Sequence, residues 1–210
     1  MSNLQVNGFF PGELAPSVTV GGSIEIFENA WPNPEKTIEL VEQEIASGSA
    51  GIYWERAPTI GDGVKQNIRT NYMLGLTHLA SVADNSLLQN IHNQFRMLLL
   101  ATSTYYSTRH GCDRELWHEP YSMLKYSSSQ EYKAHYDGST DTGRAISAIA
   151  YLNDNYEGGE LEFPNFKIKI KPKPGMLILF PSNYAYRHIA HPIKEGTKYA
   201  IVTWIKDRNT

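Results

Sequence analysis

Short apolar stretches separated by turn-forming residues run through the second half of the chain. From Glu115 onward, eight stretches mix β-branched and aromatic residues with polar positions, and clusters such as Ser127–Ser129 and Asn153–Asn155 separate them. This composition and spacing are typical of short β-strands. The predicted strands are Tyr121–Tyr126, Tyr132–Asp137, Ala145–Leu152, Gly159–Phe163, Phe166–Lys171, Met176–Phe180, Tyr186–Ala190 and Lys198–Ile205.

The first half of the chain has a helical periodicity instead. Apolar residues recur every three or four positions after Pro34, which predicts a helix to about Ser47, with Asn33 as its cap and Gly48 as its stop. The same spacing predicts a long helix from Asn85 to about Thr104. Two strands are expected before these helices, at Ser17–Val20 and Ser23–Ala30.

The elements together predict a mainly β chain with flanking helices. Eight strands at short spacing favour a double-stranded β-helix, or jelly roll, and the N-terminal helices would pack on one of its sheets. We expect a single domain over residues 1–210. Within it, residues 1–22 would form an extended arm, 23–114 a strand and supporting helices, and 115–206 the jelly-roll core.

A segment rich in glycine connects the two predicted helices. Residues 48–69 contain the aromatic residues Tyr53 and Trp54 and the turn Gly61–Gly63. Aromatic side chains on such a segment can close over a site as a lid, or simply anchor a solvent-exposed loop. The sequence leaves both interpretations open.

Composition excludes several classes of protein. The net charge of -3 gives no basic surface for general nucleic-acid binding, and the single cysteine, Cys112, excludes a disulfide framework. The first 17 residues lack the pattern of a signal peptide, and no apolar stretch is long enough to span a bilayer. We therefore expect a cytoplasmic protein without nucleic-acid or membrane partners.

The candidate chemistry centres on a pair of metal-ligating residue types. His135 and Asp137 are two positions apart, so on a strand their side chains share a face. With one distant histidine they would form the two-histidine, one-carboxylate triad of non-haem Fe(II) oxygenases. His188 and His191 compete for the third position, and His188 is favoured by the residues that follow it.

Lys198 supports this choice of ligand. It lies ten positions after His188, and on a strand it shares a face with Ala200, Val202 and Trp204. A buried lysine that faces a metal site requires an anion, because an uncompensated buried charge is costly. A dicarboxylate that chelates the metal at one end and meets Lys198 at the other would supply it.

The motifs of this region extend over nearly half of the chain. They run in order through Tyr126, Tyr132-Lys133-Ala134-His135-Tyr136-Asp137, Arg144, Tyr151-Leu152-Asn153-Asp154, Gly158-Gly159-Glu160-Leu161, Phe163-Pro164, Lys173-Pro174-Gly175, His188, Pro192-Ile193, Gly196, Lys198 and Trp204. In order and spacing, the region from Trp117 to Ile205 resembles the catalytic domain of 2-oxoglutarate- and Fe(II)-dependent prolyl 4-hydroxylases.

The resemblance implies a reaction and its cofactors. The chain would hydroxylate a prolyl residue of a peptide or protein at its 4-position, using Fe(II), 2-oxoglutarate and O₂, with release of succinate and CO₂ and with ascorbate as reductant. The alternative is a hydroxylase of the same superfamily that acts on a non-prolyl side chain or a free amino acid. A binding module without catalysis is a further alternative.

The resemblance also implies residue roles. His135, Asp137 and His188 would hold the iron, and Lys198, Tyr126 and Tyr151 would bind 2-oxoglutarate. Arg144, Trp204 and Tyr132 would contact the substrate. Packing within the core is the competing interpretation for Tyr151, Arg144, Trp204 and Tyr132.

Overall fold

The computed structural model describes residues 16–48, 51–59, 63–83, 86–111, 116–138 and 142–207. Most of the predicted N-terminal arm, the first residue of the predicted long helix, part of the Gly61–Gly63 turn and Cys112 lie outside these residues.

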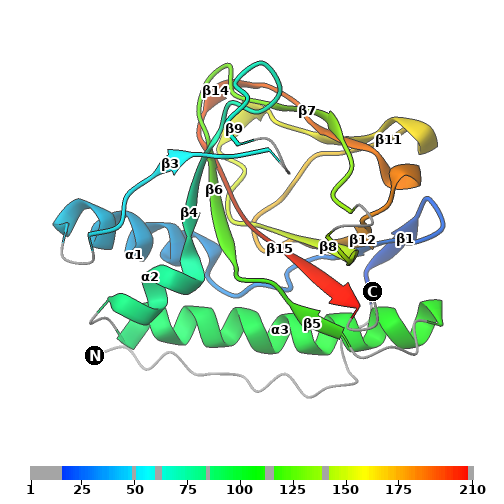
Figure 1. Cartoon of the computed structure of the whole chain (residues 1–210), viewed down its shortest axis with the longest axis horizontal. Helices are drawn as coiled ribbons and strands as arrows, with labels where there is room; N and C mark the ends of the chain where they lie inside the picture. The colour runs from blue at the N-terminus through cyan, green and yellow to red at the C-terminus, as the bar shows by residue number, and fades with distance from the viewer. Residues whose placement is uncertain are drawn as a thin grey trace.

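A nine-stranded sheet forms the larger layer of the described fold (Figure 1). Its central strands pair antiparallel over long registers, with β15 flanked by β8 and β6. In order across the sheet the strands are β1 (Val18–Val20), β2 (Ile24–Phe27), β12 (Leu177–Pro181), β8 (Arg144–Tyr151), β15 (Lys198–Asp207), β6 (Ser122–Tyr126), β4 (Tyr72–Gly75) and β3 (Glu55–Arg56), with β5 (Leu116–His118) paired to β15.

A smaller sheet forms the second layer. It has the order β11 (Ile168–Ile170), β10 (Leu161–Phe163), β13 (His188–Ala190) and β7 (Tyr132–His135), and a separate pair joins β9 (Tyr156–Gly158) to β14 (Ile193–Gly196). Phe163 and Leu161 of the small sheet share an apolar cluster with Ile178 and Phe180 of the large one. Two antiparallel sheets joined in this way are consistent with the predicted jelly roll, and the mainly β class is confirmed.

Three α-helices and two short 3₁₀ helices complete the described chain: α1 (Pro34–Ser47), α2 (Leu76–Val82), α3 (Ser86–His110), η1 (Pro164–Phe166) and η2 (Tyr184–Tyr186). Figure 1 shows α3 running alongside the large sheet. Leu88, Phe95 and Leu99 of α3 belong to the same apolar cluster as Leu177 and Ile201 of the sheet. Burying this cluster leaves the opposite face of the sheet to line a cavity. No helix among the described residues is long and apolar enough to cross a bilayer.

All eight strands predicted in the second half are present, most of them shorter than predicted. The sequence did not reveal β3, β4, α2, β5, β9 and β14. The strand predicted at Tyr132–Asp137 ends at His135, so Asp137 follows the strand. The long helix continues beyond Thr104 to His110.

Three local predictions need correction. Asn33 occupies the cap position of α1, but it adopts a left-handed backbone (φ 52°) and its side chain makes no capping hydrogen bond. Phe166 lies in the 3₁₀ helix η1, which ends at Lys167 with a left-handed backbone (φ 55°), so the strand begins only at Ile168. The strand predicted at Ser23–Ala30 is limited to β2, and all four of its residues are buried.

Candidate active site

A cavity of about 460 Å³ lies between the two sheets. Side chains of β6, β8 and β15 line one side of it, and side chains of β7, β10 and β13 line the other. This volume is in the range of small-molecule pockets. The four β15 residues predicted to share a face all line it: Lys198, Ala200, Val202 and Trp204.

The structure brings His135, Asp137 and His188 together at one side of this cavity. His135 ends β7 and His188 begins β13, and the two residues are directly paired across these antiparallel strands. Asp137 is held at the turn after β7, where its amide and that of Gly138 both donate to the carbonyl oxygen of Ser182. The three potential ligand atoms lie within 4.8 Å of one another.

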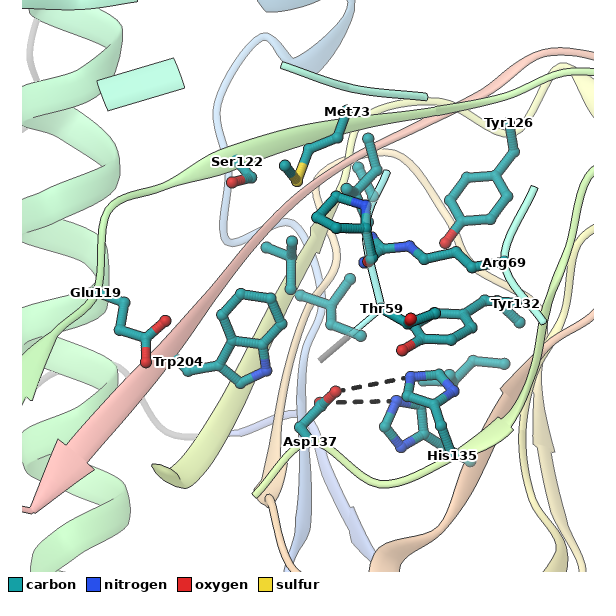
Figure 2. Close-up of a pocket in the computed structure, with 18 of the residues that line it drawn as sticks. Thr59, Arg69, Met73, Glu119, Ser122, Tyr126, Tyr132, His135, Asp137 and Trp204 are labelled. Atoms are coloured by element: carbon teal, nitrogen blue, oxygen red, sulfur yellow. Dashed lines mark hydrogen bonds and ion pairs between the residues drawn. The ribbon is translucent and has the colours of Figure 1, made fainter. Parts of the chain in front are cut away.

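Both imidazoles present the same nitrogen to this cluster. Nδ1 of His135 lies 2.7 Å from the carbonyl oxygen of Lys133, and Nδ1 of His188 lies 3.1 Å from that of Tyr186. Because a carbonyl only accepts, each Nδ1 carries a proton, and in the neutral form of each ring Nε2 is the nitrogen whose lone pair can bind a metal. Nε2 of His135 is 3.6 Å from Oδ1 of Asp137, and Nε2 of His188 is 3.7 Å from Oδ2 (Figure 2).

The protonation states also suit metal binding. Burial lowers the pKa of His135 to about 3, and the neighbouring charge of His188 acts in the same direction. Burial alone would raise the pKa of Asp137, but His188, His135 and the hydroxyl of Ser147 outweigh it and hold the pKa below its usual value. The site therefore presents a neutral His135 and an ionised carboxylate near neutral pH.

A buried pair of serines supports the carboxylate. Ser147 donates to Oδ2 of Asp137 at 2.6 Å, and the hydroxyl groups of Ser147 and Ser182 are 2.8 Å apart. Such outer hydrogen bonds orient a metal ligand. The donor set of two imidazole nitrogens and one carboxylate fits Fe(II), and three ligands from one side leave coordination positions open.

Lys198 lies in the same cavity and is almost completely buried, with 2% of its surface exposed. Its ammonium donates to the carbonyl oxygen of Gly159 at 2.9 Å and lies 4.6 Å from the centre of the Tyr126 ring. No carboxylate of the described residues is within ion-pair distance of it. Burial lowers the pKa of Lys198 to about 7, as expected for a cation without a counter-ion.

The two tyrosines predicted to bind the cosubstrate lie close to this lysine. Tyr126 is the cross-strand neighbour of Lys198, and Tyr151 pairs with Ala200 on the other side of β15. Both are buried and line the cavity, and burial raises the pKa of each hydroxyl above its usual value. They therefore remain neutral hydrogen-bonding groups at that end of the cavity.

Arg144 and Trp204 stack against each other at the cavity wall. The guanidinium lies 3.5 Å from the centre of the indole ring and donates to both carboxylate oxygens of Glu119, at 2.9 and 2.7 Å. The Nε1 of Trp204 is buried without a hydrogen-bond partner among the described residues and lies on the side of Asp137 (Figure 2). The charge of Arg144 is thus already compensated by Glu119.

Comparisons with known proteins point to one family. Residues 121–206 match the model of the 2OG-Fe(II) oxygenase superfamily. A probable prolyl 4-hydroxylase 9 of Arabidopsis thaliana is 28% identical over 139 residues, which cover 52% of this chain and 46% of that protein. The match places residues 121–206 in the 2OG-Fe(II) oxygenase superfamily, and prolyl 4-hydroxylases are among the relatives of this region. The expected enzyme class is thereby confirmed at the level of the family.

Solved structures show the same fold. A viral collagen prolyl hydroxylase of Paramecium bursaria Chlorella virus-1, solved with 2-oxoglutarate, matches with a TM-score of 0.63 and 22% identity, over 89% of this chain and 97% of that chain. A Trichoplax adhaerens prolyl hydroxylase, solved with a peptide of hypoxia inducible factor, matches with a TM-score of 0.69 and 19% identity, over 89% and 84%. The oxygenase spans about half the length of the first curated relatives it matches.

Arg69 is the cavity residue that sequence reasoning missed in this oxygenase. Its guanidinium lies 4.6 Å from the ring centre of Tyr132, and Tyr132 in turn stacks on His135, with ring centres 3.4 Å apart. Figure 2 shows Arg69 between Tyr126 and Tyr132. A single arginine in a loop carries no periodic signal. Sequence reasoning also missed Ser147, although a lone polar residue in an apolar strand is a signal that could have found it.

His191 lies outside the metal cluster. It follows β13, and its Nε2 pairs with the carboxylate of Glu162. In the glycine-rich segment, Pro58, Thr59 and Arg69 line the cavity, whereas Trp54 packs near Tyr199 and donates to Glu42. The C-terminal part of this segment therefore lines the cavity, and its N-terminal part packs against the rest of the protein through Trp54. The role of the segment as a lid stays a prediction.

Proposed function

We propose that the chain is an Fe(II)- and 2-oxoglutarate-dependent hydroxylase of a prolyl residue in a peptide or protein, acting at the 4-position. The observation that carries this proposal is the combination of two features in one cavity. Three ligand atoms of the required types converge within 4.8 Å, and the same space is lined by a buried lysine that pairs with no carboxylate in the described part of the chain.

When bound, iron and 2-oxoglutarate would supply the oxidation: one atom of O₂ enters succinate as CO₂ is lost, and the other enters a C–H bond of the substrate. His135, Asp137 and His188 would hold the metal. The chain itself would supply orientation, while the cofactor would supply the redox chemistry.

Lys198 would bind the far carboxylate of 2-oxoglutarate, with the hydroxyl groups of Tyr126 and Tyr151 beside it. An ammonium that is 2% exposed would gain a counter-ion in this way, which offsets the cost of burying its charge. Arg144, Trp204 and Tyr132 would form the substrate side of the cavity. Of these, Tyr132 also orients His135 through the stack.

The prolyl substrate is supported by similarity to named prolyl hydroxylases, one of them solved with a peptide of hypoxia inducible factor. We therefore propose that the partner of this chain is a proline-containing peptide or protein. We also propose ascorbate as its reductant and a cytoplasmic location. Neither a nucleic acid nor a membrane is part of the proposal.

Succinate formation tests this function. With Fe(II), ascorbate and 2-oxoglutarate, a set of proline-containing peptides should stimulate succinate release, and the product should carry 4-hydroxyproline by mass spectrometry and amino-acid analysis. Replacing Lys198 with methionine should raise the KM for 2-oxoglutarate at least about tenfold, because a charge-assisted contact is lost. Lys169→Met, an exposed lysine of β11, is the matched control and should behave as wild type.

Two results would reject parts of this proposal. A protein that binds neither Fe(II) nor 2-oxoglutarate under anaerobic conditions is not an oxygenase of this kind. Succinate release stimulated by free amino acids, and not by peptides, would instead identify the alternative reaction on a small substrate.

A further inference from the structure

Arg69 is a buried cation of the cavity that the proposed reaction does not use. It is 7% exposed, and its guanidinium faces the cavity beside Tyr132. Nε donates to Oδ1 of Asn71 at 2.8 Å, and Nη1 donates to the carbonyl oxygen of Pro58 at 2.8 Å. The hydroxyl of Tyr126 is a further hydrogen-bond partner of the guanidinium. These neutral partners fix its position without bringing a carboxylate of the described residues to its charge.

No carboxylate of the described residues pairs with Arg69. The contrast with Arg144 is informative, because Arg144 lines the same cavity and is held by both oxygens of Glu119. Glu119 also pairs with Lys206 at 3.0 Å. The charge of Arg144 is therefore compensated by a carboxylate, whereas no carboxylate of the described residues compensates the charge of Arg69.

Under the proposed function, both carboxylates of the cosubstrate already have partners other than Arg69. 2-Oxoglutarate has two carboxylates: one would chelate the metal with its keto group and the other would meet Lys198. Arg69 lies beside the hydroxyl of Tyr126, on the face of Tyr132 that His135 does not occupy (Figure 2). A buried guanidinium without a counter-ion favours an anion that arrives with another ligand.

We propose that Arg69 is a specificity-determining residue that binds a carboxylate of the substrate. The inference rests on the proposed function and narrows its substrate class to one that carries a carboxylate near the hydroxylated residue. Two sources have this chemistry: an aspartate or glutamate next to the target in a peptide, and the α-carboxylate of a free amino acid. The fork of the guanidinium suits a carboxylate of either kind.

Paired probes that differ only in this charge test the inference. One pair is the blocked peptide Ac-Gly-Pro-Asp-Gly-NH₂ and its Asn counterpart; a second is Ac-Gly-Asp-Pro-Gly-NH₂ and its Asn counterpart. The third pair is L-proline and L-prolinamide. Binding of each is measured by calorimetry under anaerobic conditions to the wild type loaded with Fe(II) and 2-oxoglutarate.

The wild type should bind the carboxylate member of at least one pair about tenfold or more tightly than the amide member. Arg69→Gln should abolish this preference while leaving 2-oxoglutarate affinity and amide-probe affinity within about twofold. Arg56→Gln is the matched control. Arg56 also lies over a tyrosine ring, that of Tyr72, and donates to the carbonyl oxygen of Thr70, but it is exposed outside the cavity.

Three outcomes would overturn the inference: equal binding of both members of every pair to the wild type, a preference that survives Arg69→Gln, or a loss of 2-oxoglutarate affinity in that variant without a change in preference. The last outcome would assign Arg69 to the cosubstrate. If thermal melts show that Arg69→Gln does not fold, Arg69→Lys replaces it and should keep part of the preference. A protein that binds no 2-oxoglutarate at all fails the proposed function instead.

Discussion

Tyr132 stacks on the imidazole of His135 with ring centres 3.4 Å apart and an interplanar angle of 14°. The hydrogen bond from Nδ1 to the carbonyl of Lys133 fixes the tautomer, and the stack fixes the plane of the ring. One aromatic residue predicted to contact substrate thus also positions a metal ligand.

Removing this stack should weaken the metal site. Tyr132→Ala should lower metal affinity about two- to tenfold, corresponding to ~0.5–1.5 kcal/mol for an aromatic pair. Tyr132→Phe keeps the stack and should bind metal within about twofold of wild type. Anaerobic calorimetry with Fe(II) measures both. Equal losses in the two variants would show that the hydroxyl, and not the ring, supports His135.

The hydroxyl of Ser147 should contribute to Fe(II) affinity, because it orients the carboxylate of Asp137. Ser147→Ala removes the 2.6 Å hydrogen bond to Asp137 and should reduce Fe(II) affinity about 10- to 100-fold. Ser122→Ala, at another serine of the cavity, is the control and should leave the affinity unchanged. An unaltered affinity in Ser147→Ala would mean that the carboxylate is oriented by its backbone bonds to Ser182 alone.

The sequence was sufficient for the elements whose signals are local. The eight strands of the second half follow from alternation and breakers, and α1 follows from its periodicity, Pro34 and Gly48. The spacing of His135, Asp137 and His188 likewise identified residues that the fold brings within 4.8 Å. These features depend on residues close in sequence or on a motif.

What the sequence did not give depends on tertiary contacts. The short strands β9 and β14 exist because they pair with each other, far apart in the chain. Arg69 reaches the cavity because Asn71 and Pro58 hold its guanidinium, and neither contact has a sequence pattern. The pairing of Arg144 with Glu119 was also invisible, since the two residues are 25 positions apart.

Binding of 2-oxoglutarate should take up a proton near and above neutral pH. Burial lowers the pKa of Lys198 to about 7, so much of the lysine is neutral at pH 8. A bound carboxylate favours the ammonium and raises this pKa. Calorimetry at pH 8 in buffers of different ionisation enthalpy should show proton uptake, and the affinity should fall as the pH rises further.

The lowered pKa of Lys198 also makes the free energy of unfolding depend on pH. Between about pH 7 and the unfolded pKa of roughly 10.4, the unfolded chain binds a proton at Lys198 that the native chain lacks, so this residue makes stability rise with pH. Lys198→Met should remove both the proton uptake and this contribution. Uptake that persists in Lys198→Met would assign the proton to another group.

The identity of the distal metal ligand is the central claim, and Fe(II) binding to two single variants tests it most directly. His188→Ala should lose at least about 100-fold in anaerobic Fe(II) affinity, because one of three ligands is gone. His191→Ala, which loses only a pair with Glu162, should bind one Fe(II) per chain as the wild type does. Full affinity in His188→Ala together with a loss in His191→Ala would contradict the account.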